Sequence, residues 1–328
     1  MTAYYNLGAF LGQYYPPFGN GSDGEVILGS GSVTLKSIYE DDDVSGVTTW
    51  RGTDKGLNHG TDSYLPYRNK TFGNCRNVPN FTNFTINNGA TLTIDALGEG
   101  TDLNNGVAWF CCTGTCTNSG AIDLAAKGWI GAPWTWGDSE NGRGPGGGIN
   151  GRGGSNPPPY GGTGGPIYGS TNIPKKPWEN LFGSGASAGG GAVYDDSWYG
   201  GGGAGAGHRS VGEDGSDGLA KTPQTAGPSS GIPGNGGGAL RIYAVNFNTE
   251  SGTISVNGQN AVNGHAGGGS GGTVYIKTLN GKLGTNKITS TGGIGLTDWA
   301  SSVGGDGSEG RIHIDGPYTG STTTPPIE

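Results

Sequence analysis

A short glycine-led unit recurs in the last third of the chain and restricts the folds open to it. The segment Gly238–Tyr243 reads Gly-Ala-Leu-Arg-Ile-Tyr, and Gly272–Lys277 and Gly310–Asp315 repeat its pattern of apolar positions. Gly272 follows Gly238 by 34 residues, and Gly310 follows Gly272 by 38. Self-similarity of this kind is typical of repeat architectures, in which each unit buries its apolar face only against its neighbours.

A second strand pattern follows the first two units at a constant distance. Gly252–Gly258 and Asn286–Gly292 each begin 14 residues after the leading glycine of their unit, and Gly120 follows Gly106 by the same 14 residues much earlier in the chain. The second and fourth residues after these leading positions alternate with polar ones, which indicates strands with one buried face. The positions assigned to the core are Ala108, Phe110, Ile122, Leu124, Leu240, Ile242, Ile254, Val256, Val274, Ile276, Ile312 and Ile314.

These patterns predict an all-β protein built from glycine-led strand pairs, either a β-solenoid or a β-sandwich. A spacing of 14 residues suits a solenoid corner or a hairpin equally well. Alternation over 25–28, 32–39 and 81–95, the last around an Asn-Gly turn, completes a first β block. The expected organisation is an aromatic N-terminal arm (1–24), the first β block (25–128), an insert rich in Gly, Pro and aromatic residues (129–238), a second β block of repeats (239–316) and a Thr/Pro tail (317–328).

The insert has no apolar periodicity, and its glycine runs leave two readings open. The chain has 73 Gly and 18 Pro in 328 residues, a level typical of disordered sequence, but it also has 8 Trp, 14 Tyr and 8 Phe. The insert is therefore either flexible or an array of extended polyproline II strands packed side by side. Its aromatic side chains either cover the β core or form a binding surface on loops. The candidates for ligand binding are Trp134, Trp136, Tyr160, Trp178, Tyr194, Trp198 and Tyr199.

Charge and motif content exclude several classes of function. The net charge is −8 and no basic cluster occurs, so a nucleic-acid partner is not expected. No apolar run reaches 18 residues, so no membrane span is expected, and the first residues lack the pattern of a secretory signal. GxSxG occurs three times, as expected by chance in so glycine-rich a chain, and none has the strand and helix context of a hydrolase. We expect no catalytic role.

A small acidic motif occurs three times and suggests the one cofactor considered. The pattern Asn/Asp-Gly-Ser-acid-Gly begins at Asn20, Asp214 and Asp306. It is either an acidic turn that opens a strand or a calcium site built from oxygen ligands. The weak metal candidates are Asp214, Asp217, Asp306 and Glu309. The acidic run 40–43 has the same two readings, with a solvated loop favoured, and no other cofactor is expected.

Cysteines and glycosylation sequons complete the candidate residues. Cys75, Cys111, Cys112 and Cys116 are expected to be buried thiols or to include a disulfide, since their spacing gives no good zinc motif. Adjacent Cys111 and Cys112 would point to opposite faces of a strand. Acceptor sequons for N-glycosylation occur at Asn20, Asn69, Asn80 and Asn83.

The order of the motifs resembles a class of viral and surface proteins. The series runs from Gly-Ser-Asp-Gly-Glu-Val-Ile-Leu (21–28) through polyglycine to Gly-Gly-Ser-Gly-Gly-Thr-Val-Tyr-Ile (268–276) and closes on 310–325. It is similar to glycine-rich β-repeat proteins of tailed viruses and microbial surfaces, and its polyglycine tracts resemble the distal adhesins of phage tail fibres. The resemblance implies a non-enzymatic virion or extracellular surface protein.

Two functions are compatible with this resemblance. The first is an adhesin that binds a cell-surface receptor, expected to be a glycan or protein, through loops in 129–238. The second is a self-assembling filament, coat or decoration subunit whose glycine-rich loops pack against neighbours. Both imply homo-oligomers and contacts with other virion or filament subunits.

Overall fold

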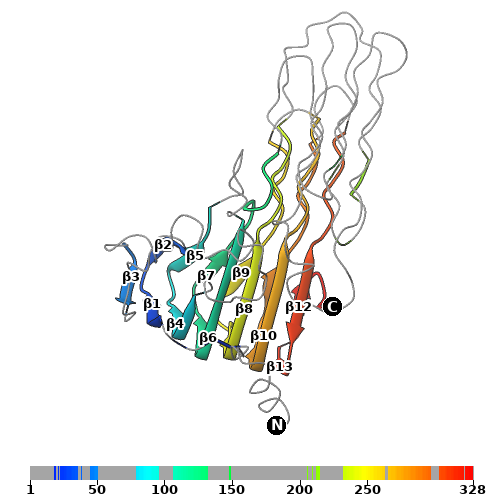
Figure 1. Ribbon diagram of the computed structural model, residues 1–328. Helices are drawn as coiled ribbons and strands as arrows, with labels where there is room; N and C mark the ends of the chain where they lie inside the picture. The colour runs from blue at the N-terminus through cyan, green and yellow to red at the C-terminus, as the bar shows by residue number, and fades with distance from the viewer. Residues whose placement is uncertain are drawn as a thin grey trace, which may run out of the picture.

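The computed structural model describes residues 18–19, 21, 23–35, 38, 45–50, 79–95, 106–131, 148, 205, 209, 212–214, 232–262, 265–296, 303–320 and 322–327. Within these ranges the regular structure is almost entirely β-strand, so the all-β prediction is confirmed. The strands form two open sheets, and extended chain segments continue beyond the ends of several strands in one common direction (Figure 1).

The larger sheet, sheet A, takes one strand from each repeating unit. Its strands in spatial order are β12 (Arg311–Asp315), β10 (Thr273–Lys282), β8 (Ala239–Asn248), β6 (Val107–Asn118), β4 (Asn80–Ile86), β1 (Gly24–Leu28) and β3 (Val47–Trp50), with β13 (Tyr318–Thr319) beside β10. Neighbouring strands are parallel except for β1 and β3, which are antiparallel. Apart from β3 and β13, spatial order follows chain order.

The smaller sheet, sheet B, takes the second strand of each unit in the same succession. Its strands are β14 (Thr322–Thr324), β11 (Thr285–Thr289), β9 (Thr253–Ser255), β7 (Ala121–Asp123), β5 (Ala90–Thr93) and β2 (Gly31–Thr34), all parallel to their neighbours. The chain therefore passes from sheet A to sheet B within each unit and returns to sheet A in the next.

The corners between the sheets explain the 14-residue spacing in the sequence. The two strands of a pair lie in different sheets, so the spacing marks a corner rather than a hairpin. The Asn-Gly turn after β4 is one such corner, because it leads to β5 in sheet B. Gly89 has a φ of +83° there, a conformation that glycine adopts without a steric penalty.

The repeats stack in the register that their sequence offsets predict. Val274 of β10 lies opposite Leu240 of β8 on one side and Ile312 of β12 on the other. All twelve residues assigned to the core belong to one buried apolar cluster between the sheets. Phe81, Phe84 and Phe110 fill its N-terminal half, and the ring centroid of Phe84 lies 4.8 Å from each of the other two.

The two predicted β blocks form one continuous body. β6 pairs directly with β8, with Val107 opposite Ala239, so the insert falls between adjacent strands of sheet A. Residues assigned to a C-terminal tail contribute β13 and β14, which pair with β10 and β11. The insert thus leaves the body and returns to it one strand further along.

Candidate functional site

Six glycine-rich segments extend from the sheets and form the most unusual part of the described chain. Segments 124–131, 256–262 and 290–296 leave the ends of β7, β9 and β11, whereas segments 232–238, 266–272 and 303–310 lead into β8, β10 and β12. Figure 1 shows parts of these segments running side by side beyond the sheets. We call this set the glycine bundle.

Hydrogen bonds between the segments recur in steps of three residues. Gly234 and Gly237 donate to the carbonyls of Gly267 and Ser270, and Gly268 and Gly271 donate to those of Gly305 and Ser308. Segment 266–272 also bonds segment 256–262, since Gly269 donates to Gln259 and Gly272 donates to Val256. Three residues make one turn of a polyproline II helix, which has no hydrogen bonds of its own and so bonds to neighbours in several directions.

Close contact between backbones explains the glycine content of these segments. A Cβ atom on Gly269 would overlap the carbonyl oxygen of Asn235, and one on Gly272 would overlap the carbonyl oxygen of Gly238. Both obstacles are backbone atoms, which cannot rotate away. The interior of the glycine bundle therefore has no room for a side chain at these positions.

Asparagine side chains add a second set of bonds with the period of the repeat. The Oδ1 atom of Asn257 accepts from the amide of Thr291 at 2.9 Å, and that of Asn260 accepts from the amide of Ile294 at 2.8 Å. Both bonds span 34 residues, the offset between neighbouring units. These amides fasten each outgoing segment to the next.

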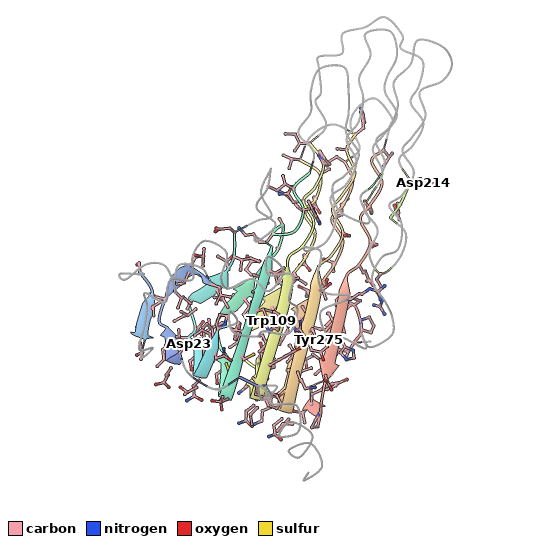
Figure 2. All side chains as sticks on the ribbon, in the orientation of Figure 1. Asp23, Trp109, Asp214 and Tyr275 are labelled. Carbon is pink, nitrogen blue, oxygen red and sulfur yellow. The ribbon has the colours of Figure 1, made fainter. Side chains whose placement is uncertain are left out.

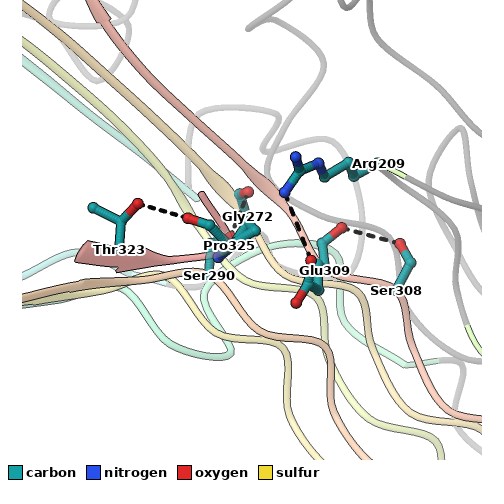
Figure 3. Close-up of polar contacts among 7 residues, drawn as sticks. All are labelled: Arg209, Gly272, Ser290, Ser308, Glu309, Thr323 and Pro325. Carbon is teal, nitrogen blue, oxygen red and sulfur yellow. Dashed lines mark hydrogen bonds and ion pairs between the residues drawn. The ribbon is translucent and has the colours of Figure 1, made fainter. Parts of the chain in front are cut away.

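The bundle joins the sheets at Ser290, which is fully buried (Figure 3). Its hydroxyl donates to the carbonyl of Gly272 at 2.8 Å, and its own carbonyl accepts from the amide of Gly310 at 2.7 Å. Its amide donates to the carbonyl of Thr324 at 2.6 Å. One residue thus links two glycine segments to the end of sheet B.

Part of the insert lies along the last glycine segment. The amides of Arg209 and Glu213 donate to the carbonyls of Glu309 and Asp306, and the side chains of Arg209 and Glu309 form an ion pair at 3.6 Å (Figure 3). The insert begins after β7, so its residues 209–213 cross the two intervening units to reach segment 303–310. They therefore contact the bundle at the side where its repeats end.

The described calcium candidates have protein contacts. Oδ1 of Asp306 accepts from the amide of Gly295 at 2.7 Å, and Glu309 pairs with Arg209. Asp214 lies near the outer edge of the bundle (Figure 2), and Asp217 lies outside the described residues. Within the described ranges no three His, Cys, Asp or Glu residues gather into a group that could hold a metal ion.

The outer face of sheet A carries a row of aromatic and cationic side chains. Trp109, Arg241, Tyr275 and His313 occupy equivalent positions on β6, β8, β10 and β12. The guanidinium carbon of Arg241 lies 4.1 Å from the ring centroid of Trp109 and 5.6 Å from that of Tyr275, and Tyr275 stacks on His313 with centroids 5.4 Å apart. Figure 2 shows Trp109 and Tyr275 on this face. We call these four residues the aromatic row.

The aromatic row is buried although it faces away from the core. Trp109, Arg241 and Tyr275 are each at most 5% exposed, and Tyr243 in the adjoining row accepts a hydrogen bond from Arg241. Phe18 packs against this second apolar cluster and is the described residue of the predicted aromatic arm that reaches it. The sequence already held a signal for the row, because all four members stand three residues after a leading glycine.

Ionisable groups surround the end of this row. The Tyr275 hydroxyl donates to Oδ2 of Asp315 at 3.1 Å, and Nζ of Lys277 donates to the same oxygen at 2.7 Å. Burial raises the pKa of Tyr275 above its usual value and the Asp315 carboxylate adds to the rise, while the charge of Arg241 opposes it. Burial alone would raise the pKa of Asp315, but the hydrogen bond and charge of Lys277, with Tyr275 and His313, hold that pKa below its usual value.

The remaining predicted site residues are only partly within the described chain. The ligand-binding candidates Trp134, Trp136, Tyr160, Trp178, Tyr194, Trp198 and Tyr199 lie outside the described residues, as do Cys75, Asn20 and Asn69. Asn80 is 9% exposed and its amide donates to Asp23 at 2.6 Å, while Oδ1 of Asn83 accepts from the amide of Thr115 at 2.9 Å.

The described cysteines are free thiols. Cys111, Cys112 and Cys116 are all buried, which agrees with the first of the two predictions for them. Cys112 and Cys116 belong to the cluster between the sheets, whereas Cys111 belongs to the cluster on the outer face of sheet A. Adjacent cysteines therefore point to opposite faces, as expected for a strand.

Comparison with protein-family models, curated proteins and solved structures finds no match to this chain. Among the described residues, none of the helical structure is long and apolar enough to cross a membrane. Function is therefore inferred from the geometry of the chain itself.

Proposed function

We propose that this chain is a non-enzymatic adhesin of a virion or extracellular surface, in which a β-solenoid body carries a polyproline II bundle with receptor-binding loops. The observation that carries the proposal is the three-residue step of hydrogen bonds between the glycine segments. A bundle bonded in this way is rigid without bulky side chains. It is suited to holding loops at a fixed distance from the body.

The succession of strands supports the solenoid part of the proposal. A chain that visits sheet A and sheet B alternately, with parallel neighbours in each, advances by one strand spacing per unit. A sandwich with Greek-key connections would instead place antiparallel strands beside one another. The parallel pairs between β1 and β12 and between β2 and β14 favour the solenoid.

The directions of the glycine segments support the placement of the binding loops. Segments 256–262 and 266–272 are antiparallel, since Gly269 and Gly272 donate to Gln259 and Val256. Segments 290–296 and 303–310 are antiparallel as well, since Gly307 and Gly310 donate to Gly293 and Ser290. The chain therefore reverses direction away from the sheets. The interval 132–231, which holds the predicted aromatic residues, starts and ends at the same side.

Cell binding by the full chain provides the test. Fluorescently labelled protein is incubated with a panel of bacterial strains, and bound protein is measured by flow cytometry. We expect at least one strain to bind the parent chain, and Trp198→Ala with Tyr199→Ala to lower this binding at least tenfold. The control Thr253→Val, on the sheet surface, should bind normally. Unchanged binding by loop variants, with all variants folded by circular dichroism, would contradict the loop assignment.

A self-assembling filament or coat subunit is the second candidate. It is favoured by the open ends of sheet A, where β12 has one strand partner and β3 has one strand partner within the described chain. Light scattering after size exclusion tests it. Polymers that form at micromolar concentration, with no binding to any cell in the panel, would favour assembly over adhesion.

A further inference from the structure

The outer face of sheet B carries a continuous row of short polar side chains, one from each strand. Strand partners along this row are Thr34 with Thr93, Asp123 with Ser255, Ser255 with Thr289, and Thr289 with Thr324. The Thr93 hydroxyl donates to the Asp123 carbonyl at 2.8 Å and so joins the two halves. Five of the six side chains in this row are hydroxyls.

A second row runs beside the first, two residues earlier on each strand. Ser32 pairs with Thr91, Thr91 with Ala121, and Ala121 with Thr253. The residue between the two rows is buried in the core on β2, β5, β7, β9 and β11. Side chains alternate between the faces of a strand, so both rows point away from the core. Together they form what we call the hydroxyl array.

The hydroxyl array is accessible, in contrast to the outer face of sheet A. Ser32, Asp123, Thr253 and Thr324 are exposed, and the other members that the structure describes are half-buried. The charged residues of the two rows are Asp123 and Lys287, the residue before Ile288, and their charges are opposite. The face is therefore polar and close to neutral.

This composition restricts the kind of ligand. Each hydroxyl can donate one hydrogen bond and accept two, so the array suits a partner that also carries many hydroxyls. It has no excess of cations for phosphate or another polyanion. It also lacks the aromatic and aliphatic side chains that form the centre of protein interfaces. An uncharged, hydroxyl-rich ligand is left.

The spacing and rigidity of the array restrict the ligand further. Neighbouring strands lie about 4.8 Å apart, which is close to the length of one pyranose unit, so a row presents one polar side chain per sugar. Threonine is branched at Cβ and has few accessible side-chain rotamers, so less conformational entropy is lost on binding. A linear polymer lying across the strands would meet an equivalent set of groups at every step.

We propose that the hydroxyl array binds a neutral linear polysaccharide that runs across the strands of sheet B. The site is separate from the insert and does not depend on the receptor role of the insert loops. It would add an extended, low-specificity contact with a glycan surface.

Affinity electrophoresis of the full chain tests the proposal. The protein is run through native gels that contain hydroxyethyl cellulose, galactomannan or dextran, and its mobility is compared with that in a plain gel. We expect retardation by at least one of the polymers with extended β-1,4 backbones. Thr253→Val and Thr289→Val preserve shape but remove a hydroxyl, so each should weaken the apparent affinity about fivefold.

Matched variants separate binding by the hydroxyls from binding by the insert. Thr253→Ser and Thr289→Ser keep the hydroxyl and should retain most of the retardation, and Trp198→Ala in the insert should leave it unchanged. No retardation by any of the three polymers, or equal retardation of the Val variants and the parent, overturns the proposal. Inhibition of ice growth without retardation also overturns it, because the ligand of the array would then be ordered water.

Discussion

The guanidinium carbon of Arg241 lies 4.1 Å from the ring centroid of Trp109, although 132 residues separate them in the chain. The contact follows from the register of the repeat, because β6 and β8 are adjacent and place these residues opposite each other. The ring of Tyr243 lies 4.7 Å from the same carbon. A buried cation is thus held between aromatic rings at the point where the insert interrupts the succession of strands.

Substitution of Arg241 tests whether this contact holds the two halves of the body together. A buried cation over an aromatic face contributes up to about 2 kcal/mol. Arg241→Lys keeps the charge but loses the planar group that lies over Trp109 and donates to Tyr243. We expect the free energy of unfolding, measured by urea titration, to fall by about 1–2 kcal/mol.

Arg209→Lys is the matched control, because it makes the same chemical change in an ion pair nearer the surface. The side chains of Arg209 and Glu309 are 29% and 51% exposed, so this pair should contribute less than about 1 kcal/mol. Equal losses from the two substitutions would contradict a special role for Arg241.

A single methyl group at Gly269 should disrupt the glycine bundle. Its Cβ would overlap the carbonyl oxygen of Asn235 in the neighbouring segment, so one backbone must move away from the other. We expect Gly269→Ala to lower the free energy of unfolding by about 3 kcal/mol or more. Thermal unfolding followed by circular dichroism measures the loss.

Gly89→Ala separates steric overlap from a general intolerance of alanine. Gly89 has a φ of +83° with open space around its missing Cβ, so only the backbone conformation is strained. That strain costs about 1–2 kcal/mol. A loss at Gly269 no larger than the loss at Gly89 would show that the segments can separate without penalty.

Acid should weaken the contacts around Asp315. The pKa of this carboxyl is lowered in the folded chain, with Lys277 as the main favourable partner, so its contribution is complete above the unfolded value of about 3.9 and is lost as pH falls. The group is partly exposed, which limits the contribution to about 1 kcal/mol. Asp315→Asn should therefore be less stable than the parent at pH 6 and closer to it at pH 2.5. A difference that stays constant between these pH values would contradict the assignment.

Alkali should act on Tyr275 with the opposite sign. Burial raises the pKa of Tyr275 in the folded chain, so its contribution is complete below the unfolded value of about 10 and is lost as pH rises. Tyr275→Phe removes the hydroxyl that ionises. The stability difference between the parent and this variant should shrink between pH 8 and pH 11, whereas Tyr318→Phe, at an exposed position, should show no such trend.

The sequence alone predicts the core of the body well, because the strands repeat. The pattern of Leu240 and Ile242 recurs in Val274 and Ile276 at one offset, and parallel pairing in register places equivalent residues side by side. Each unit buries the same two positions. All twelve assignments to the core therefore hold, including those before the insert.

The sequence does not reveal which surface of the body is covered. Trp109 and Thr253 both point away from the core, yet Trp109 is buried and Thr253 is exposed. Alternation of apolar and polar residues gives a face to each side chain, but what lies over that face depends on segments distant in sequence. The corner between the sheets is equally ambiguous in the sequence, since 14 residues fit a hairpin as well.

The buried cysteines should be chemically silent until the protein unfolds. Burial raises the pKa of the Cys112 thiol well above its usual range, with Cys116 adding to the rise, and the thiolate is the reactive form. In a Cys75→Ser variant, which removes the cysteine outside the described residues, we expect no reaction of Cys111, Cys112 or Cys116 with Ellman's reagent at pH 8 over one hour.

Urea should release three thiols per chain from this variant, with a midpoint that matches the loss of β-structure by circular dichroism. Coincidence is expected because Cys112 and Cys116 lie between the sheets, where a reagent can enter only when the strands separate. Cys111 lies on the other face beside Trp109 and Tyr243. Release of one thiol at lower urea than the other two would therefore show that the cover over sheet A opens before the core does.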